Sequence, residues 1–189
     1  MKISDYSKLA VGHFLRELGS ASPAPGGGAA AALTASLGAA LLEMVARLNK
    51  DGAAAKKAEG IKNRLASLMV LDAKAFEKIY TLYKKKTSCC APRYQTALKN
   101  AAATPEEICL LSAQGVKLAL SQNNKTSAWL ISDLKEAAIL FKASFESARL
   151  NVNVNLKGFH DTASAKKIDS RLNKEYAQLL KNGGKVLKG

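Results

Sequence analysis

A chain of 189 residues, 48% of them hydrophobic, is long enough to bury a sizeable core, so we expect one domain over residues 1–189. Ala and Leu supply much of the apolar content, aromatic residues make up only 6%, and alternating β-branched runs are few, which predicts an all-α fold. The formal charge of +14 attracts anions, but no Arg-rich or aromatic-interleaved motif of the kind that contacts bases occurs, so nucleic acid is not a favoured partner.

The cysteine and histidine residues give no sign of a metal site. Cys89, Cys90 and Cys109 are an odd number without metal-ligand spacing, and neither His13 nor His160 lies near a second ligand in the sequence. No signal peptide precedes them, so the pattern indicates a reduced, cytoplasmic protein. We therefore expect no metal ion and no zinc chemistry.

The N-terminal part of the chain predicts a helix, a loop and a longer helix. Apolar residues on a helical period favour a first helix over about residues 4–18, closed by Gly19. The segment SPAPGGG, residues 22–28, forms a loop, and a second helix follows over about residues 27–48. Small residues leave little side chain on much of this helix, so we expect it at the centre of a bundle of about six or seven helices.

A membrane span is the competing interpretation of this segment, because residues 26–42 contain no charge. A span needs roughly 20 strongly apolar residues. Here Ala dominates, and Glu43 and Arg47 follow soon after. The sequence favours a buried helix, and no membrane partner is expected.

An acidic residue interrupts the apolar stripe of the third predicted helix, residues 53–85. A carboxylate on an apolar face is costly because desolvation disfavours its charge, and such groups are enriched where catalysis needs a tuned acid or base. An ion pair with a Lys or Arg side chain, or a helix that turns the carboxyl group toward solvent, is the structural alternative. Asp72 fills the gap in the stripe made of Ile61, Leu65, Leu68, Phe76, Ile79 and Tyr83.

Two further helices are predicted on either side of the asparagine pair 123–124. The sequence TPEE, residues 104–107, places a capping residue before a proline, so we expect a helix to start there after a short helix at 94–102. Beyond the asparagines, a helix from about Ser127 carries Asp133 on its inward side.

The segment NVNVNL alternates polar and apolar residues as a strand does. It is short, follows a helix without a stop signal and has no partner strand, so we interpret it as helical. In a helix, 18 residues make five turns, which puts Asn151 on the same line as Asp133, with Asn155 close to it. A last helix is predicted from residue 161 to the glycine pair 183–184.

Four segments form an ordered pattern over most of the chain. The first is FLRELGSASPAPGGGAAAALTASLGAALLEMVARL, in which a PAPGGG loop opens an Ala- and Gly-rich helix that ends in a Met-Val pair. Three shorter segments follow it in order. They are DAKAF at Asp72, SDL at Ser132 with the alanine pair 137–138, and NV at Asn151 leading to NL at Asn155. Together they resemble the formiminotetrahydrofolate cyclodeaminase and methenyltetrahydrofolate cyclohydrolase family.

The resemblance implies an all-helical homodimer that acts on a one-carbon unit carried by tetrahydrofolate, without a metal or organic cofactor. In the cyclodeaminase reaction, folate N10 attacks the formimino carbon on N5 and ammonia leaves, giving 5,10-methenyltetrahydrofolate. In the cyclohydrolase reaction, water opens the methenyl bridge and gives 10-formyltetrahydrofolate. Folates bear one or several glutamate carboxylates, so a basic surface near the site would raise their capture rate.

The same resemblance assigns roles to residues of the motifs. Asp72 matches the family's acid/base position, where a carboxylate stabilises the cationic centre and transfers its protons. Asp133 is the second catalytic candidate, for holding the pterin or orienting water. Asn151 and Asn155 offer hydrogen bonds to the pterin, although capping or inter-helix bonding would use them equally well.

The glycine loop is expected to shape the folate pocket. Glycines permit close approach and expose free amide groups at a helix N-terminus, where an anion or a carbonyl oxygen is favoured. A tight turn needed only to pack a small-residue helix is the alternative. The loop residues assigned to substrate binding are Pro25, Gly26, Gly27 and Gly28.

The chain departs from the family pattern at two places. Ala29 stands where a serine often follows the third glycine, and LNKDG, residues 48–52, stands where the family continues with Leu-Thr and a basic, Tyr-containing segment. The sequence does not choose between the two reactions. The alternative from another functional class is a non-catalytic, basic helical protein that binds or assembles with an acidic protein or nucleic acid.

Overall fold

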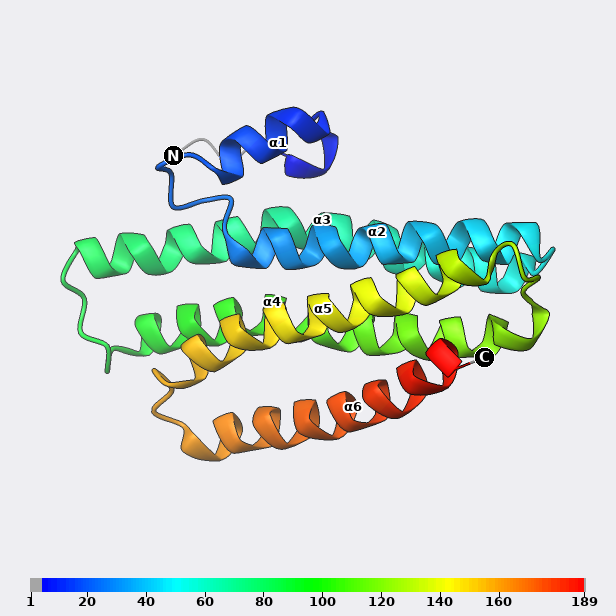
Figure 1. Ribbon diagram of the computed structural model, residues 1–189. Coiled ribbons are helices and arrows are strands. Elements are labelled where there is room, and N and C mark those ends of the chain that lie inside the picture. Colours follow the sequence, from blue (N-terminus) through cyan, green and yellow to red (C-terminus); the bar gives the residue numbers. More distant parts are fainter. Residues whose placement is uncertain (1–4, 189) are drawn as a thin grey trace.

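The computed structural model describes residues 5–188, which form six α-helices and two short 3₁₀ helices (Figure 1). No strand occurs among these residues, so the predicted all-α fold is confirmed. The long helices α2 to α6 run side by side, and α1 lies on the outside of the bundle. The elements are η1 (Tyr6–Lys8), α1 (Val11–Leu18), α2 (Gly27–Leu48), α3 (Gly52–Lys84), α4 (Pro92–Gln122), η2 (Asn123–Lys125), α5 (Ile131–Leu156) and α6 (Thr162–Lys188).

Helix α2 lies at the centre of the bundle because its small residues let neighbouring helices approach closely. It packs against α3, α4 and α5, and Ala29, Ala32 and Ala35 are completely buried. A Cβ atom on Gly38 would lie 3.1 Å from the carbonyl oxygen of Ala137 on α5, so a larger residue would push the two backbones apart. The predicted buried, Ala- and Gly-rich central helix is confirmed.

By length and composition alone, α2 is also long and apolar enough to cross a membrane. Within the bundle, however, 56% of its apolar window is already buried. The helix also buries Glu43, which accepts hydrogen bonds from Arg47 at 2.6 Å and from Lys62 at 2.5 Å. Both features favour a core helix over a membrane span.

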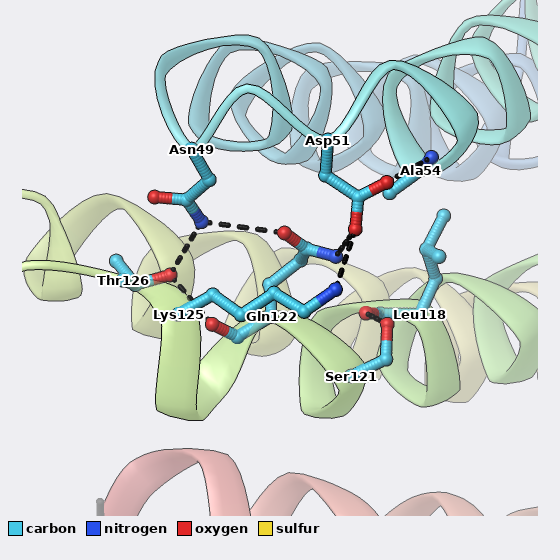
Figure 2. A network of polar contacts seen from close by, with 8 residues as sticks. All are labelled: Asn49, Asp51, Ala54, Leu118, Ser121, Gln122, Lys125 and Thr126. Atoms are coloured by element: carbon cyan, nitrogen blue, oxygen red, sulfur yellow. Dashed lines mark hydrogen bonds and ion pairs between the residues drawn. The ribbon is translucent and has the colours of Figure 1, made fainter.

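A polar network joins the turn between α2 and α3 to the C-terminal end of α4 (Figure 2). Asp51 caps α3 by accepting the N–H of Ala54 at 3.0 Å, and its other oxygen accepts from Gln122 at 3.0 Å and Lys125 at 2.7 Å. The Nδ2 of Asn49 donates to the Oε1 of Gln122 at 3.3 Å. The LNKDG segment, residues 48–52, therefore connects the C-terminal end of α2 and the N-terminal end of α3 to the C-terminal end of α4.

The first helix is shorter than predicted. Asp5 caps η1, and the backbone is then extended at Leu9 and Ala10 before α1 begins; residue 4 lies outside the described residues. Tyr6 and Phe14 are nevertheless both buried and meet edge to face. The apolar pattern thus placed Phe14 correctly, but Val11 and Leu15 of the same pattern are 70% and 55% exposed, and the pattern did not show the interruption before α1.

The predicted helix start at Thr104-Pro105 is wrong, because α4 continues through Pro105. Proline has no N–H, so the carbonyl oxygen of Ala101, one turn earlier, loses its helical donor. Asn155 of α5 supplies a replacement: its Nδ2 lies 3.2 Å from that oxygen. Thr104, the expected capping residue, is instead buried inside α4, and Glu106 is buried and hydrogen bonded to Arg171 of α6.

The remaining boundaries agree in part with the predictions. NVNVNL is helical, as predicted, and forms the end of α5, which begins at Ile131 rather than near Ser127. The predicted end of the last helix at the glycine pair 183–184 is wrong, since α6 continues to Lys188. Val186, beyond the glycines, is completely buried, and this packing favours continuation of the helix.

Candidate active site

A cavity of about 280 Å³ lies where the N-terminus of α2 meets α3, α4 and α5. The loop before α2, the second half of α3, the first half of α4 and the last turns of α5 all contribute to its lining. Asp72 is the one ionisable residue among the lining residues. The cavity therefore combines a single carboxyl group with backbone amides and two Asn side chains.

The carboxyl group of Asp72 lies directly against the first turn of α2. A Cβ atom on Gly28 would lie 2.1 Å from Oδ1 and 2.4 Å from Oδ2 of Asp72, so this approach requires a glycine. The backbone N–H of Ala29 donates a hydrogen bond to the carboxylate. The positive end of the α2 dipole also faces this group. The third glycine of SPAPGGG thus makes room for Asp72.

Burial raises the pKa of Asp72 from 3.8 to about 6, although the hydrogen bond from Ala29 acts in the opposite direction. No charged neighbour contributes to this shift, so the alternative of a buried ion pair with Lys or Arg does not apply. A carboxyl group with a pKa near neutrality can both accept and donate a proton near pH 7. Asp72 therefore has the properties of a general acid and base.

Asn151 and Asn155 approach the same cavity from the end of α5, one helical turn apart. Asn151 lies next to the loop, since a Cβ atom on Gly27 would lie 3.6 Å from both polar atoms of its side chain. The Nδ2 of Asn155 is occupied by two carbonyl oxygens, of Ala101 at 3.2 Å and Asn151 at 3.1 Å. Inter-helix hydrogen bonding therefore uses the NH₂ group of Asn155, while its Oδ1 has no protein partner among residues 5–188.

Three of the four assigned loop residues line the cavity. Gly26, Gly27 and Gly28 do so, whereas Pro25 is buried behind them and follows a cis peptide bond. No glycine within residues 5–188 has a positive φ angle. Close approach, and not a left-handed backbone, requires a glycine at Gly28, whereas a Cβ atom on Gly26 or Gly27 would make only ordinary contacts at 3.6 Å.

Asp133 does not line this cavity. It lies in the first turn of α5, whereas Asn151 lies near the other end of that helix. At 1.5 Å per residue, about 27 Å of helix separates the two. The prediction that they share one helical line is compatible with this distance, but within one chain the structure does not bring Asp133 to Asp72.

Sequence reasoning missed the apolar lining of the cavity. Phe76 and Ile79 were expected in the core, but both line the cavity, and Phe76 is 38% exposed. Tyr83, from the same predicted stripe, is 70% exposed. The spacing of Phe76 and Ile79 from Asp72, four and seven residues, is the signal that could have placed them on the site.

The donor atoms of the cavity are poorly suited to a metal ion, because its lining includes one carboxylate and no Cys or His. A larger hollow of about 540 Å³ lies between α3 and α4. It is lined by apolar and basic residues, including Lys57 and Lys117, and has no carboxyl group. The smaller cavity around Asp72 is the better candidate for proton-transfer chemistry.

Comparison with known proteins identifies relatives of the whole chain. Residues 10–174 match the formiminotransferase-cyclodeaminase family. The methenyltetrahydrofolate cyclohydrolase of Methylorubrum extorquens is 33% identical over 188 residues, which cover 90% of this chain and 88% of that protein. The formimidoyltransferase-cyclodeaminase of Sus scrofa is 31% identical over 180 residues, which cover 84% of this chain but only 32% of that protein.

A solved structure shares the fold. The crystal structure of formiminotetrahydrofolate cyclodeaminase from Thermotoga maritima matches with a TM-score of 0.91 and 27% sequence identity, over 96% of this chain and 95% of that chain. These matches confirm the resemblance inferred from the motifs. The chain therefore belongs to the formiminotransferase-cyclodeaminase family.

Proposed function

We propose that this protein is a folate one-carbon enzyme that forms or opens the 5,10-methenyl bridge of tetrahydrofolate. The reaction is either the cyclodeaminase step from 5-formiminotetrahydrofolate or the cyclohydrolase step between the 5,10-methenyl and 10-formyl forms. The names of the relatives support both reactions. The observation that carries the proposal is Asp72, a lone half-buried carboxyl group with a pKa of about 6 against the N-terminus of α2.

In the cyclodeaminase direction, the Asp72 carboxylate accepts the proton of N10 as N10 attacks the formimino carbon. The protonated carboxyl group then donates to the leaving nitrogen, which departs as ammonia. In the cyclohydrolase direction, Asp72 accepts a proton from the water that attacks the methenyl carbon and donates it to N5 as the bond between N5 and that carbon breaks. The hydroxyl group of the adduct releases its remaining proton to solvent as the formyl C=O forms. In both, the ionised carboxylate stabilises positive charge on the amidinium-like centre.

The cavity suits the pterin end of the substrate. Its volume is about 280 Å³. This is close to the smallest volumes of small-molecule binding sites, about 300 Å³. The exposed Phe76 offers a ring face, and the side-chain oxygens of Asn151 and Asn155 offer acceptors for pterin N–H groups. The glutamate end of the folate then extends out of the cavity.

The net charge of +14 supports capture of folates with several glutamates. Electrostatic capture weakens as salt screens the charges. We expect the KM for polyglutamylated substrate to rise with ionic strength more steeply than the KM for monoglutamate. Equal salt dependence of the two KM values would contradict this part of the proposal.

The proposal also includes a homodimer. Leu37, Met44 and Leu48 are exposed on α2, at 53%, 38% and 50%. Their spacing of seven and four residues places them on one face of the helix. Exposed apolar residues grouped on one helix face in this way are typical of protein–protein contacts.

The deciding experiment follows the absorbance of 5,10-methenyltetrahydrofolate with purified protein and either the formimino or the methenyl substrate. We expect turnover of at least one substrate, and its loss in Asp72→Asn with unchanged helical circular dichroism. Asp133→Asn is the matched control and is expected to retain turnover, because Asp133 lies outside the cavity. Folded protein that turns over neither substrate would favour the non-catalytic alternative, and normal rates in Asp72→Asn would refute the role of that residue.

A further inference from the structure

Two loops at one end of the bundle bring together three side chains that commonly bind metal ions. Cys89 and Cys90 lie between α3 and α4, and His160 lies between α5 and α6. One ligand atom of each residue lies within 4.8 Å of the others, and all three residues are exposed. The expectation of no metal site rested on spacing along the sequence, which does not detect ligands from different loops.

We propose that Cys89, Cys90 and His160 form a binding site for Zn²⁺, separate from the cavity around Asp72. The two Sγ atoms lie 3.8 Å apart. Two Zn–S bonds of about 2.3 Å at a tetrahedral angle also place the sulfurs about 3.8 Å apart. The cysteine pair thus already has the separation that one tetrahedral ion requires, His160 supplies a third ligand, and the fourth position is left to water.

The side chain of Gln95, in the first turns of α4, connects the two loops that carry the ligands. Its Nε2 donates to the carbonyl oxygens of Cys89 at 2.8 Å and Gly158 at 3.0 Å. Its Oε1 accepts the backbone N–H of His160 at 3.0 Å. Outer contacts that orient metal ligands in this way are a regular part of protein metal sites. Gln95 is therefore a positioning residue for the zinc site.

The charge of the ligand set suits the surroundings of the site. A protein with a net charge of +14 opposes the approach of a cation unless the ligands compensate for its charge. Metal binding deprotonates cysteine thiols. Two thiolates then balance the two charges of Zn²⁺, so the bound complex adds no positive charge beside the lysine run 84–86.

Zinc at this place would join the ends of two helices that carry the cavity residues. The cysteine loop follows α3, which carries Asp72, and the histidine loop follows α5, which carries Asn151. A ligand that binds the folded state and not the unfolded state raises stability by mass action. Zinc is therefore expected to raise the melting temperature of the protein.

The test uses the full chain, reduced and freed of metal, with Co²⁺ as a spectroscopic probe and Zn²⁺ as its competitor. We expect one equivalent of Co²⁺ to produce thiolate-to-cobalt charge-transfer absorption and tetrahedral ligand-field bands, which Zn²⁺ then removes. The double variant Cys89→Ser/Cys90→Ser should lose the charge-transfer band and the zinc-dependent rise in melting temperature. Cys109, buried elsewhere, remains in that variant, so the loss reports the exposed pair.

Matched variants separate ligand loss from a general effect on folding. His160→Ala should weaken Zn²⁺ binding, whereas His13→Ala, which removes the other histidine, should not. Gln95→Ala should keep the cobalt spectrum but lower the affinity about 10- to 100-fold. The proposal is overturned if the wild-type protein binds no stoichiometric Zn²⁺ or Co²⁺, or if the double cysteine variant binds them as tightly while its metal-free circular dichroism is normal.

Discussion

Asp72 and Gly28 form a pair in which each residue explains the other. The glycine lets the carboxyl group approach the first turn of α2, and the carboxyl group explains why no side chain is tolerated at position 28. Ala29 takes part only through its backbone N–H, since its side chain is completely buried. The replacement of serine by Ala29 therefore leaves this main-chain hydrogen bond intact.

Asp72→Asn should stabilise the free protein at neutral pH. The pKa of Asp72 is about 6 in the folded state, above its ordinary 3.8, so the folded state binds more protons between these values and stability falls as pH rises from about 4 to about 6. The ionised carboxyl group then costs up to about 3 kcal/mol above pH 6. Denaturant unfolding from pH 4 to 8 should show a gain for Asp72→Asn that is largest above pH 6 and vanishes near pH 4. A gain that does not vary with pH would contradict the elevated pKa.

Gly28→Ala should reduce turnover because the new Cβ atom would displace the carboxyl group of Asp72. Misplacement of a catalytic group by about 1 Å typically costs about 100-fold in rate. Gly60→Ala is the matched control on α3, since a Cβ atom there meets nothing within 4 Å. It should gain about 0.5–1 kcal/mol of stability and keep its activity. Similar turnover in the two variants would show that the approach of Asp72 to α2 is not required.

The sequence located the central residue of the site but not its surroundings. The gap in the apolar stripe identified Asp72, because helical periodicity reports the direction in which a side chain points. Periodicity does not report distance along the axis, so Asp133 was grouped with Asn151 although about 27 Å of helix separates them. Phe76 has the same direction as Asp72, but only the packing of four segments shows that this part of α3 faces a cavity.

At the scale of helices, local signals failed where a contact from another helix replaced a local one. Pro105 is a strong start signal, but Asn155 supplies the donor that the proline removes, so α4 continues. The glycine pair 183–184 is a strong stop signal, but burial of Val186 holds α6 together beyond it. The composition of α2 gave the correct result because small residues favour close packing wherever the neighbouring helices lie.

Gly115→Ala tests the close packing of α4 against α5. A Cβ atom at this position would lie 2.3 Å from the ring of Phe141, which is completely buried. Despite the better helix propensity of alanine, overpacking should lower the free energy of unfolding by about 1–3 kcal/mol. Gly184→Ala on α6 is the control, since a Cβ atom there meets nothing within 4 Å. If Phe141→Leu is added to Gly115→Ala and stability partly recovers, the ring of Phe141 is the cause of the loss. Equal stability of Gly115→Ala and Gly184→Ala would contradict the predicted overpacking.

At the scale of the whole molecule, the cavity and the proposed dimer face are separate features. The loop before α2 and parts of α3, α4 and α5 line the cavity around Asp72, whereas the exposed stripe of α2 has no cover within the described residues. A dimer through this stripe would bury apolar surface without rebuilding the cavity. Oligomeric state and catalysis should therefore respond to different substitutions.

Leu37→Glu should convert the proposed dimer to a monomer, because a charge placed on an apolar contact is costly to bury. Leu180→Glu, at a 42% exposed position on α6, is the matched control and should remain dimeric. Analytical ultracentrifugation measures the state of each variant, and the methenyltetrahydrofolate assay measures its turnover. The monomeric variant should keep more activity than Asp72→Asn, since Leu37 does not line the cavity around Asp72. A dimeric Leu37→Glu beside a monomeric Leu180→Glu would place the interface on α6 instead, and complete loss of activity on dissociation would show that the partner contributes to the site.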